Sequence, residues 1–312
     1  MSDLLEAQIP TRLQNVDPNN DQRSIPLIAK DLDLIKNIRN SILDLDTTHE
    51  VVLGDARNVK ISSKPIHLVV TSPPYWTLKD YPNCEGQIGR LDDYKYFLAG
   101  LNQVWRKCFK ALVPGGRLIC VVGDVCLSRR QNRGRHTVIP LHADIINQCV
   151  TIGFDNLSPI IWHKITNLQT ESTGNSSYLG KPFEPNGVLK NEIEYILMFR
   201  KPGGYRSPSR AARLMSVISH VEHNAWFRQI WNDIQGASTK EHPAPFPVEI
   251  AKRLIRMFSF VDDIVLDPFT GTASTQVAAK QCGRNSIGIE IEPSYHAIAT
   301  TRLESDLFTG RS

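Results

Sequence analysis

Apolar positions along the chain fall into two patterns, short continuous runs and longer segments in which they recur every three or four residues. The short runs predict strands near residues 51–54, 67–71, 117–123, 157–163, 193–199, 264–267 and 286–291. The recurring pattern predicts helices, among them residues 92–111, 138–150 and 247–259. Because strands and helices alternate, we expect an α/β fold with a seven-stranded, mostly parallel, doubly wound sheet.

The amino-terminal part of the chain has a different pattern. Residues 1–30 mix Asp, Asn, Gln and Pro, so we expect them to be loosely ordered or wrapped over the surface. Four apolar residues that share one helical face come next: Leu34, Ile35, Ile38 and Ile42. The chain therefore divides into an amino-terminal polar segment and helix, residues 1–49, and one larger domain, residues 50–305.

Composition bounds the class of protein. A chain of 312 residues with 41% apolar content can bury a large core. No apolar stretch approaches the length of a membrane span, and the first residues lack a basic and then apolar signal, so we expect a cytoplasmic protein. Six cysteines form no CxxC pair and no zinc spacing, which predicts reduced, mostly buried thiols and no metal site. A net charge of +4 permits a polyanionic partner without demonstrating one.

The strongest chemical feature is the hexapeptide Thr71-Ser72-Pro73-Pro74-Tyr75-Trp76, directly after an apolar run. Two consecutive prolines cannot donate ladder hydrogen bonds, so the backbone leaves the sheet in a fixed, extended shape with its carbonyls free. Such a turn offers hydrogen-bond acceptors beside a flat ring, the groups that would hold a planar base by its exocyclic amine. On its own, the hexapeptide also fits a structural proline turn under an aromatic anchor.

A second element, residues 264–275, has the pattern of a strand, a turn and the start of a helix. Gly271 lets the backbone approach a ligand closely, and Ser274 or Thr275 is expected to cap the helix that follows. The next strand ends at Glu290, about twenty residues after the glycine turn, the spacing at which a carboxylate meets ribose hydroxyls in nucleotide-binding βαβ units. The pattern therefore predicts a cofactor that contains adenosine.

Missing motifs narrow the choice of cofactor. The chain has no GxG, so the fingerprint that cradles the pyrophosphate of dinucleotides is absent. The nearest match to a P-loop, residues 174–182, has five residues between its glycines and places Pro182 where a Mg²⁺-binding Ser or Thr belongs. A nucleoside without phosphates therefore fits better than NAD or ATP.

Together these motifs resemble those of the DNA amino-methyltransferases, which use S-adenosyl-L-methionine and carry a (Ser/Asp/Asn)-Pro-Pro-(Tyr/Phe) catalytic motif. The catalytic motif precedes the cofactor motif, an order similar to that of the β group of the family, and the resemblance covers roughly residues 50–305. It implies a Rossmann-like methyltransferase fold with a circularly permuted motif order. The catalytic residues that it implies are Ser72, Pro73, Pro74 and Tyr75.

The resemblance also implies a set of cofactor-binding residues. They are Asp55, Thr71, His242, Asp267, Phe269, Gly271, Thr272, Ser274 and Glu290. Two positions depart from the family pattern. Ala273 stands where the cofactor motif commonly has its last glycine, and Phe246 stands where many relatives carry a lysine. We therefore expect no charge contact from position 246 to the cofactor carboxylate.

The chemistry implied is direct transfer of a methyl group to an amine. The Ser72 hydroxyl and the Pro73 carbonyl would accept the two amine hydrogens, and Tyr75 would stack on a base flipped out of the duplex. Carbon-5 methylation of cytosine would need a Pro-Cys dipeptide, which the sequence lacks. A leading serine resembles the N4-cytosine enzymes. The N6-adenine enzymes, an RNA or protein amine methyltransferase and a non-catalytic nucleic-acid-binding module are the alternatives.

Candidate DNA contacts come from three parts of the chain. The segment 128–136 suits phosphates, although a solvated basic loop would have the same composition; its arginines are Arg129, Arg130, Arg133 and Arg135. Trp162 and Lys164, which match the Trp-x-Lys strand of the family, are further candidates for DNA contact. Residues 165–235 contain long stretches without periodic apolar positions and are the candidate target-recognition insertion. The implied partners are duplex DNA and a cognate restriction endonuclease. We expect a monomer or homodimer that associates with the nucleoid.

Overall fold

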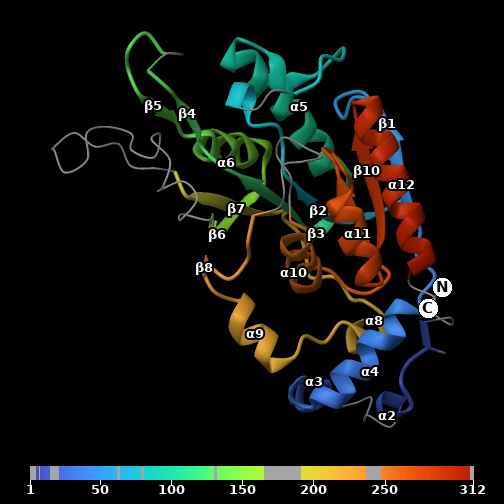
Figure 1. Ribbon diagram of the computed structural model, residues 1–312. Coiled ribbons are helices and arrows are strands. Elements are labelled where there is room, and N and C mark those ends of the chain that lie inside the picture. The colour runs from blue at the N-terminus through green and yellow to red at the C-terminus, as the bar shows by residue number, and fades with distance from the viewer. Residues whose placement is uncertain are drawn as a thin grey trace, which may run out of the picture.

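The computed structural model describes residues 5–6, 8–14, 21–61, 64–78, 81–129, 132–164, 191–236 and 247–309. Its central sheet has eight strands in the order β1-β10-β9-β2-β3-β7-β6-β8 (Figure 1). The strands are β1 (His49–Leu53), β2 (Ile66–Thr71), β3 (Leu112–Val122), β6 (Asp155–His163), β7 (Ile193–Arg200), β8 (Ile230–Trp231), β9 (Ile264–Asp267) and β10 (Asn285–Glu290). All neighbours are parallel except the two pairs that β7 forms with β3 and β6.

The seven predicted strands and the mostly parallel sheet are confirmed. The apolar pattern missed β8, because a strand of two residues is too short to show a period. The structure also contains a small hairpin of β4 (Val125–Leu127) and β5 (Thr137–Ile139), which follows the carboxyl end of β3. This hairpin explains why the helix predicted to begin at residue 138 begins only at Leu141.

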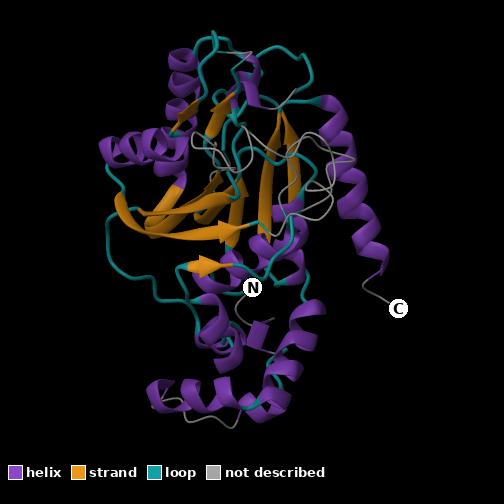
Figure 2. Ribbon diagram, turned by 60° about the vertical axis from the view of Figure 1, so that its left-hand side comes forward, coloured by secondary structure: helices purple, strands orange, loops and turns teal. Residues whose placement is uncertain are grey.

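Helices cover both faces of the sheet (Figures 1 and 2). One face carries α5 (Tyr94–Ala111) and α6 (Leu141–Ile152), and the other carries α10 (Val248–Phe258) and α11 (Ser274–Gln281). Successive residues of β3 point to opposite faces, so Cys120 packs in the cluster under α5 and Val121 packs in the cluster under α10. The predicted doubly wound arrangement is therefore present. The last helix, α12 (Pro293–Thr309), packs along β1 at the sheet edge.

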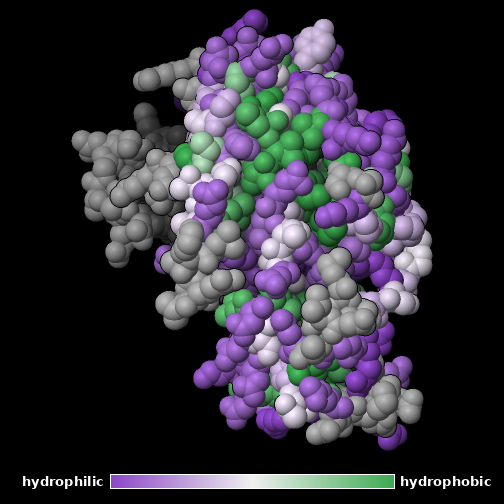
Figure 3. Space-filling view, turned by 90° about the vertical axis from the view of Figure 1, so that its right-hand side faces the viewer, coloured by the Kyte–Doolittle hydropathy of each residue, from purple (hydrophilic) through white to green (hydrophobic). Residues whose placement is uncertain are grey.

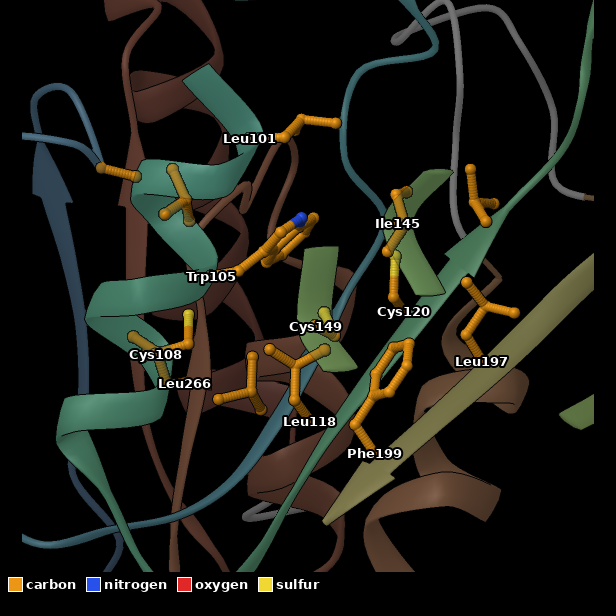
Figure 4. Close-up of a cluster of buried hydrophobic side chains, with 14 of the residues drawn as sticks. Leu101, Trp105, Cys108, Leu118, Cys120, Ile145, Cys149, Leu197, Phe199 and Leu266 are labelled. Carbon is orange, nitrogen blue, oxygen red and sulfur yellow. The ribbon is translucent and has the colours of Figure 1, made fainter. Parts of the chain in front are cut away.

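The larger core cluster lies between α5, α6 and the sheet (Figure 4). Asp93 caps the start of α5 by accepting a hydrogen bond from the Lys95 amide. Trp105 projects from α5 into the cluster beside Leu118 and Phe199, and all three side chains are fully buried. Burial of each such side chain contributes about 1.5–3 kcal/mol. Four of the six cysteines are buried, as predicted: Cys108, Cys120, Cys149 and Cys282.

The amino-terminal residues form a separate cluster with helices from the middle of the chain. It contains α2 (Thr11–Gln14), α3 (Asp21–Lys30), α4 (Leu32–Leu43) and α8 (Arg210–Met215), with α9 (His220–Trp226) beside them. The prediction of loose order was wrong for α3, whose Ile28 is buried with Leu13 of α2 and Leu214 of α8. The sequence pattern missed this packing because its partners lie about two hundred residues away in the chain.

The face shown in Figure 3 carries both kinds of side chain: apolar ones gather in the upper half, and polar ones surround them. Among the described residues, no helix combines the length and the apolar character needed to cross a membrane.

Candidate active site

A pocket opens at the carboxyl ends of β1, β2, β9 and β10, where an open parallel sheet usually binds ligands. The space between its lining atoms, counted out to the open mouth and including open solvent there, is about 630 Å³. The predicted site residues that line it are Asp55, Ser72, Pro73, Pro74, Phe269, Gly271 and Glu290. Two motifs that lie far apart in the sequence therefore share one pocket.

The proline turn forms one wall of this pocket. Ser72, Pro73 and Pro74 line it, directly after β2 ends. The Tyr75 side chain does not line the pocket, because its ring is 5% exposed and packs in the core cluster under α5. A base could therefore stack on Tyr75 only if the ring were uncovered.

The Tyr75 hydroxyl contacts two groups. It lies 3.2 Å from the Ser72 hydroxyl oxygen and 3.5 Å from the Val121 carbonyl oxygen. Burial raises the pKa of Tyr75, and the nearby Glu194 charge raises it further, so the hydroxyl keeps its proton. The Tyr75 amide donates to the Tyr81 hydroxyl at 3.2 Å, which fixes the end of the turn.

Glu290 forms the opposite wall with the glycine turn. One carboxylate oxygen accepts the Gly271 amide at 2.7 Å, and the other accepts the Glu292 amide at 2.9 Å. Gly271 has a φ of 53°, a left-handed conformation that glycine adopts without strain. Burial raises the pKa of Glu290 to about 7. The pocket therefore contains a carboxyl group that titrates near neutral pH and can still accept hydrogen bonds.

Thr71 and Asp267 were predicted to bind the cofactor, but both side chains lie behind the pocket. The Thr71 hydroxyl donates to Asp267 at 2.7 Å, and the same carboxylate oxygen accepts the Phe269 amide at 3.0 Å. Both residues are buried, and burial raises the pKa of Asp267 to about 6. The pair joins the ends of β2 and β9, so it holds the two turns together, and contact of either residue with the cofactor stays a prediction.

The helix after the glycine turn begins earlier than predicted. Ala273 occupies the capping position with a φ of 67° and no side-chain hydrogen bond, so Ser274 and Thr275 lie within α11 and do not cap it. A left-handed residue favours glycine, the residue that the family pattern has here. Ala273 is tolerated because its methyl group is buried in a small cluster with Val277. Thr272 and Ser274 are not among the residues that line the pocket, and their contact with the cofactor stays a prediction.

Asp55 lies at the mouth of the pocket and is paired with Arg57. The guanidinium donates to both carboxylate oxygens, at 3.0 Å and 2.6 Å, and also to the Gly86 carbonyl at 2.9 Å. The sequence reasoning missed Arg57, although it stands only two residues after Asp55. It also missed Tyr81 and Tyr295, which line the pocket but belong to no motif.

The lining suits a phosphate-free nucleoside. Apolar side chains from Ile88, Val104 and Ile289 offer a surface for a flat ring, and Phe269 adds an aromatic face that Trp105 supports edge-on at 6.1 Å. Carboxylates are present to accept hydroxyl donors, whereas the lining arginine is already paired. No group of metal-binding side chains occurs in the described part of the chain.

The predicted DNA-binding residues differ in their exposure. Three of them are exposed in the connection between β4 and β5: Arg129, Arg133 and Arg135. Arg130 lies outside the described residues, as does the cofactor candidate His242. Trp162 is 2% exposed and donates its indole hydrogen to the Ile234 carbonyl at 3.0 Å, so its ring is buried in the protein, and its contact with DNA stays a prediction.

Lys164 is partly exposed, but its ammonium group forms an ion pair with the buried Glu194 and lies 5.5 Å from the centre of the Trp162 ring. The pair leaves Lys164 less free to contact DNA than the sequence implied.

The structure narrows the predicted target-recognition region of residues 165–235. Within it, β7 is a strand of the central sheet, which no inserted region would supply. Because β7 runs antiparallel to β3, it ends beside Arg117 near the start of β3, and α8 follows at the end of the sheet remote from the pocket (Figure 1). By contrast, β6 ends at His163 on the pocket side of the sheet, and residues 165–190, which come next in the sequence, lie outside the described residues.

Comparison with known proteins agrees with these features. The sequence profile of the N6/N4 methyltransferase family, described as DNA methylase, matches residues 66–301. The type II methyltransferase M.MjaI of Methanocaldococcus jannaschii is 35% identical over 293 residues, which cover 84% of this chain and 93% of that protein. M.MthZI of Methanothermobacter thermautotrophicus, also a type II methyltransferase, is 31% identical over 84% of this chain and 78% of its own length.

Solved structures show the same relationship. A protein of Thermus thermophilus assigned as a DNA modification methylase, solved with S-adenosyl-L-methionine, is 49% identical, with a TM-score of 0.68 over 83% of this chain and 94% of that one. The cytosine-N4-specific PvuII DNA methyltransferase matches with a TM-score of 0.58 over 85% of this chain and 92% of that one; at 19% identity it shares the fold alone. On the profile match and the identity to these relatives, the chain belongs to the DNA methylase family of N6 and N4 amino-methyltransferases.

Proposed function

We propose that this chain methylates the exocyclic N4 amine of cytosine in duplex DNA. The observation that carries the proposal is the position of Ser72 and Pro73 on the wall of the pocket that also contains Gly271 and Glu290. The methyl donor is S-adenosyl-L-methionine, the molecule bound in the 49% identical Thermus relative. A leading serine in place of Asp or Asn is the feature that favours cytosine over adenine.

The protein groups act mainly by holding the amine. An exocyclic amine is a poor nucleophile because its lone pair is delocalised into the base. If the Ser72 hydroxyl oxygen and the Pro73 carbonyl accept its two hydrogens, the nitrogen can become pyramidal and direct its lone pair at an electrophile. Bound S-adenosyl-L-methionine supplies that electrophile as a sulfonium methyl group.

The cofactor residues follow from the pocket lining. We propose that Glu290 accepts hydrogen bonds from the ribose hydroxyls, that Phe269 packs on the adenine ring and that Asp55 lies near the ring edge. Gly271 lets the backbone approach the ligand. Thr71 and Asp267 support the turn from behind through their mutual hydrogen bond.

DNA binding and biological role are further parts of the proposal. The exposed arginines of the β4–β5 connection lie next to the pocket side of the sheet and would contact phosphates. Residues 165–190 remain the candidate target-recognition segment, and residues 50–305 the catalytic domain. The relatives are named type II methyltransferases, which supports protection of DNA against a cognate endonuclease. A cytoplasmic location stays a prediction.

The test is transfer of labelled methyl groups from S-adenosyl-L-methionine to duplex DNA, followed by hydrolysis and separation of the nucleosides. We expect N4-methylcytosine as the labelled product. N6-methyladenine as the only product would refute the choice of base. Label in RNA or protein, with none in DNA, would refute the substrate class.

Two serine variants separate chemistry from folding. Ser72→Ala removes the proposed acceptor and should abolish most transfer while the affinity for S-adenosyl-L-methionine is retained. Ser305→Ala removes an exposed hydroxyl on α12, which donates only to the Arg302 carbonyl, and should leave transfer unchanged. Equal activity of the two variants would contradict the role of Ser72.

A further inference from the structure

The proposed chemistry places a demand on the Ser72 hydroxyl that an Asp or Asn at the same position would not face. A serine hydroxyl carries one hydrogen and two lone pairs, whereas the side-chain carbonyl or carboxylate oxygen of Asn or Asp carries no hydrogen. Ser72 can accept a hydrogen from the amine only when its own hydrogen points elsewhere. Some neighbouring group must therefore take that hydrogen.

The structure contains such a group next to Ser72. The Tyr75 hydroxyl lies 3.2 Å from the Ser72 hydroxyl oxygen, and it also lies 3.5 Å from the Val121 carbonyl oxygen. A carbonyl can only accept, so the Tyr75 hydrogen satisfies Val121 when it points there. The Tyr75 oxygen is then free to accept the Ser72 hydrogen. This direction of the hydrogen-bond chain leaves the lone pairs of Ser72 free for the target amine.

The surroundings hold Tyr75 in this position. Its ring is 5% exposed, its amide is tied to the Tyr81 hydroxyl, and two prolines separate it from Ser72. The ring also lies close to Gly123, where an added β-carbon would be in van der Waals contact with it at 3.7 Å. Burial also raises the pKa of Tyr75, so its hydroxyl retains the hydrogen that it donates to Val121.

We propose that the Tyr75 hydroxyl is a positioning group that draws the Ser72 hydrogen away from the target amine, so that a Ser72 lone pair faces the amine. The proposal rests on the proposed function and adds to it a role for the hydroxyl that is separate from any contact between the ring and the base. It explains why a buried tyrosine can serve the reaction without lining the pocket.

The test is a double-mutant cycle between positions 75 and 72. Tyr75→Phe keeps the ring and removes the hydroxyl. We expect kcat to fall about tenfold, the effect of one hydrogen bond, while KM for DNA, the affinity for S-adenosyl-L-methionine and the melting temperature stay unchanged. In the Ser72→Asn background the acceptor oxygen needs no orientation, so adding Tyr75→Phe should change kcat less than twofold. The two substitutions should therefore be non-additive, which is the signature of coupling between positions 72 and 75.

Ser72→Ala provides a second background, in which no hydroxyl remains to be oriented, and its residual transfer is measured under single-turnover conditions. Tyr75→Phe should again have no further effect there. Tyr94→Phe is the matched control. The Tyr94 hydroxyl donates to Asp144 at 2.7 Å and does not line the pocket, so its removal should leave kcat unchanged.

Two results would overturn the proposal. One is a Tyr75→Phe enzyme with the wild-type kcat. The other is the same loss of kcat in the wild-type, Ser72→Asn and Ser72→Ala backgrounds, which would assign Tyr75 a general structural role. Product analysis of the wild-type enzyme tests the proposed function by itself. The cycle compares rates on whichever amine that enzyme methylates, so the two failures are distinguishable.

Discussion

The pKa of Glu290 predicts how cofactor affinity depends on pH. Burial raises this pKa to about 7, although the Gly271 and Glu292 amides donate to the carboxylate and oppose the shift. A ribose hydroxyl donates more strongly to the ionised carboxylate than to the neutral acid. Binding should therefore require Glu290 to lose its proton, and affinity should fall as the pH drops below 7.

The size of the effect follows from the ionised fraction of Glu290. With a pKa of about 7, roughly nine-tenths of the groups are ionised at pH 8 and roughly one-tenth at pH 6, so the dissociation constant should rise about tenfold. Glu290→Gln cannot ionise and loses a charged acceptor worth about 1.5–3 kcal/mol, which corresponds to a loss of about 10- to 100-fold in affinity at pH 8. The ratio of the dissociation constants of Glu290→Gln and wild type should therefore be about ten times smaller at pH 6 than at pH 8.

The stability of the ligand-free protein should change in the opposite direction. The folded-state pKa of Glu290 lies above its ordinary value of 4.5, so the protonated carboxyl contributes stability below about pH 4.5. That contribution, of the order of 3 kcal/mol at most, is lost as the pH rises through 7. The pH that favours the free fold therefore disfavours cofactor binding.

Titration calorimetry with S-adenosyl-L-methionine between pH 5.5 and 8 measures this prediction. The amino group of the ligand itself titrates near pH 8, so the evidence is the difference between wild type and Glu290→Gln at each pH. Glu292→Gln changes a neighbouring carboxylate that does not line the pocket, and it should keep the wild-type profile. Parallel pH profiles for wild type and Glu290→Gln would refute the reasoning.

Three further measurements test other parts of the structure. The first replaces the exposed arginines of the β4–β5 connection, Arg129, Arg133 and Arg135, with Gln. DNA binding should weaken while cofactor affinity is kept, and the slope of log affinity for DNA against log salt concentration should fall in magnitude by about 0.9 for each phosphate that is no longer neutralised. An unchanged slope would rule out phosphate binding by these residues. Gly288→Ala should lower the free energy of unfolding in urea by about 1–3 kcal/mol, because the added carbon would lie 2.8 Å from the Gln276 side chain. Gly236→Ala is the control and should lower it much less, because an added carbon there has nothing within 4 Å. Burial opposes ionisation of Glu222, but hydrogen bonds from Arg256 prevail and lower its pKa to about 2. Glu222→Gln should therefore lower the free energy of unfolding by about 3 kcal/mol above pH 5, and by progressively less as the pH falls toward 2. A constant cost at all pH values would show that this ion pair is not the cause.

The sequence predicted the sheet well because buried parallel strands have continuous apolar runs that stand out from their surroundings. The elements that it missed depend on distant contacts. Ile28 of α3 is buried in a cluster that includes Leu214 of α8, and α3 also contacts α9. The strand β8 pairs with the edge that β6 offers. Such partners leave no period in the local sequence.

The site was predictable where function imposes a local backbone shape. The Ser72 turn and the Gly271 turn each have a distinctive composition, and both line the pocket. Tyr81 and Tyr295 also line it, but they reach it from segments without a motif. The sequence also could not show which way a strand-end side chain faces, and for that reason Thr71 was assigned to the ligand when it donates to Asp267.

The hydrogen bond between Thr71 and Asp267 shows why the order of the two motifs along the chain matters little. The bond joins residues 196 positions apart, and it forms because β2 and β9 are neighbours in the sheet. Each strand carries its own turn at its carboxyl end, so adjacency in the sheet alone brings the Ser72 turn beside the Gly271 turn. A chain that enters the sheet at a different strand would build the same pocket, as long as these two strands remain paired. The circularly permuted motif order is therefore compatible with an unchanged active site.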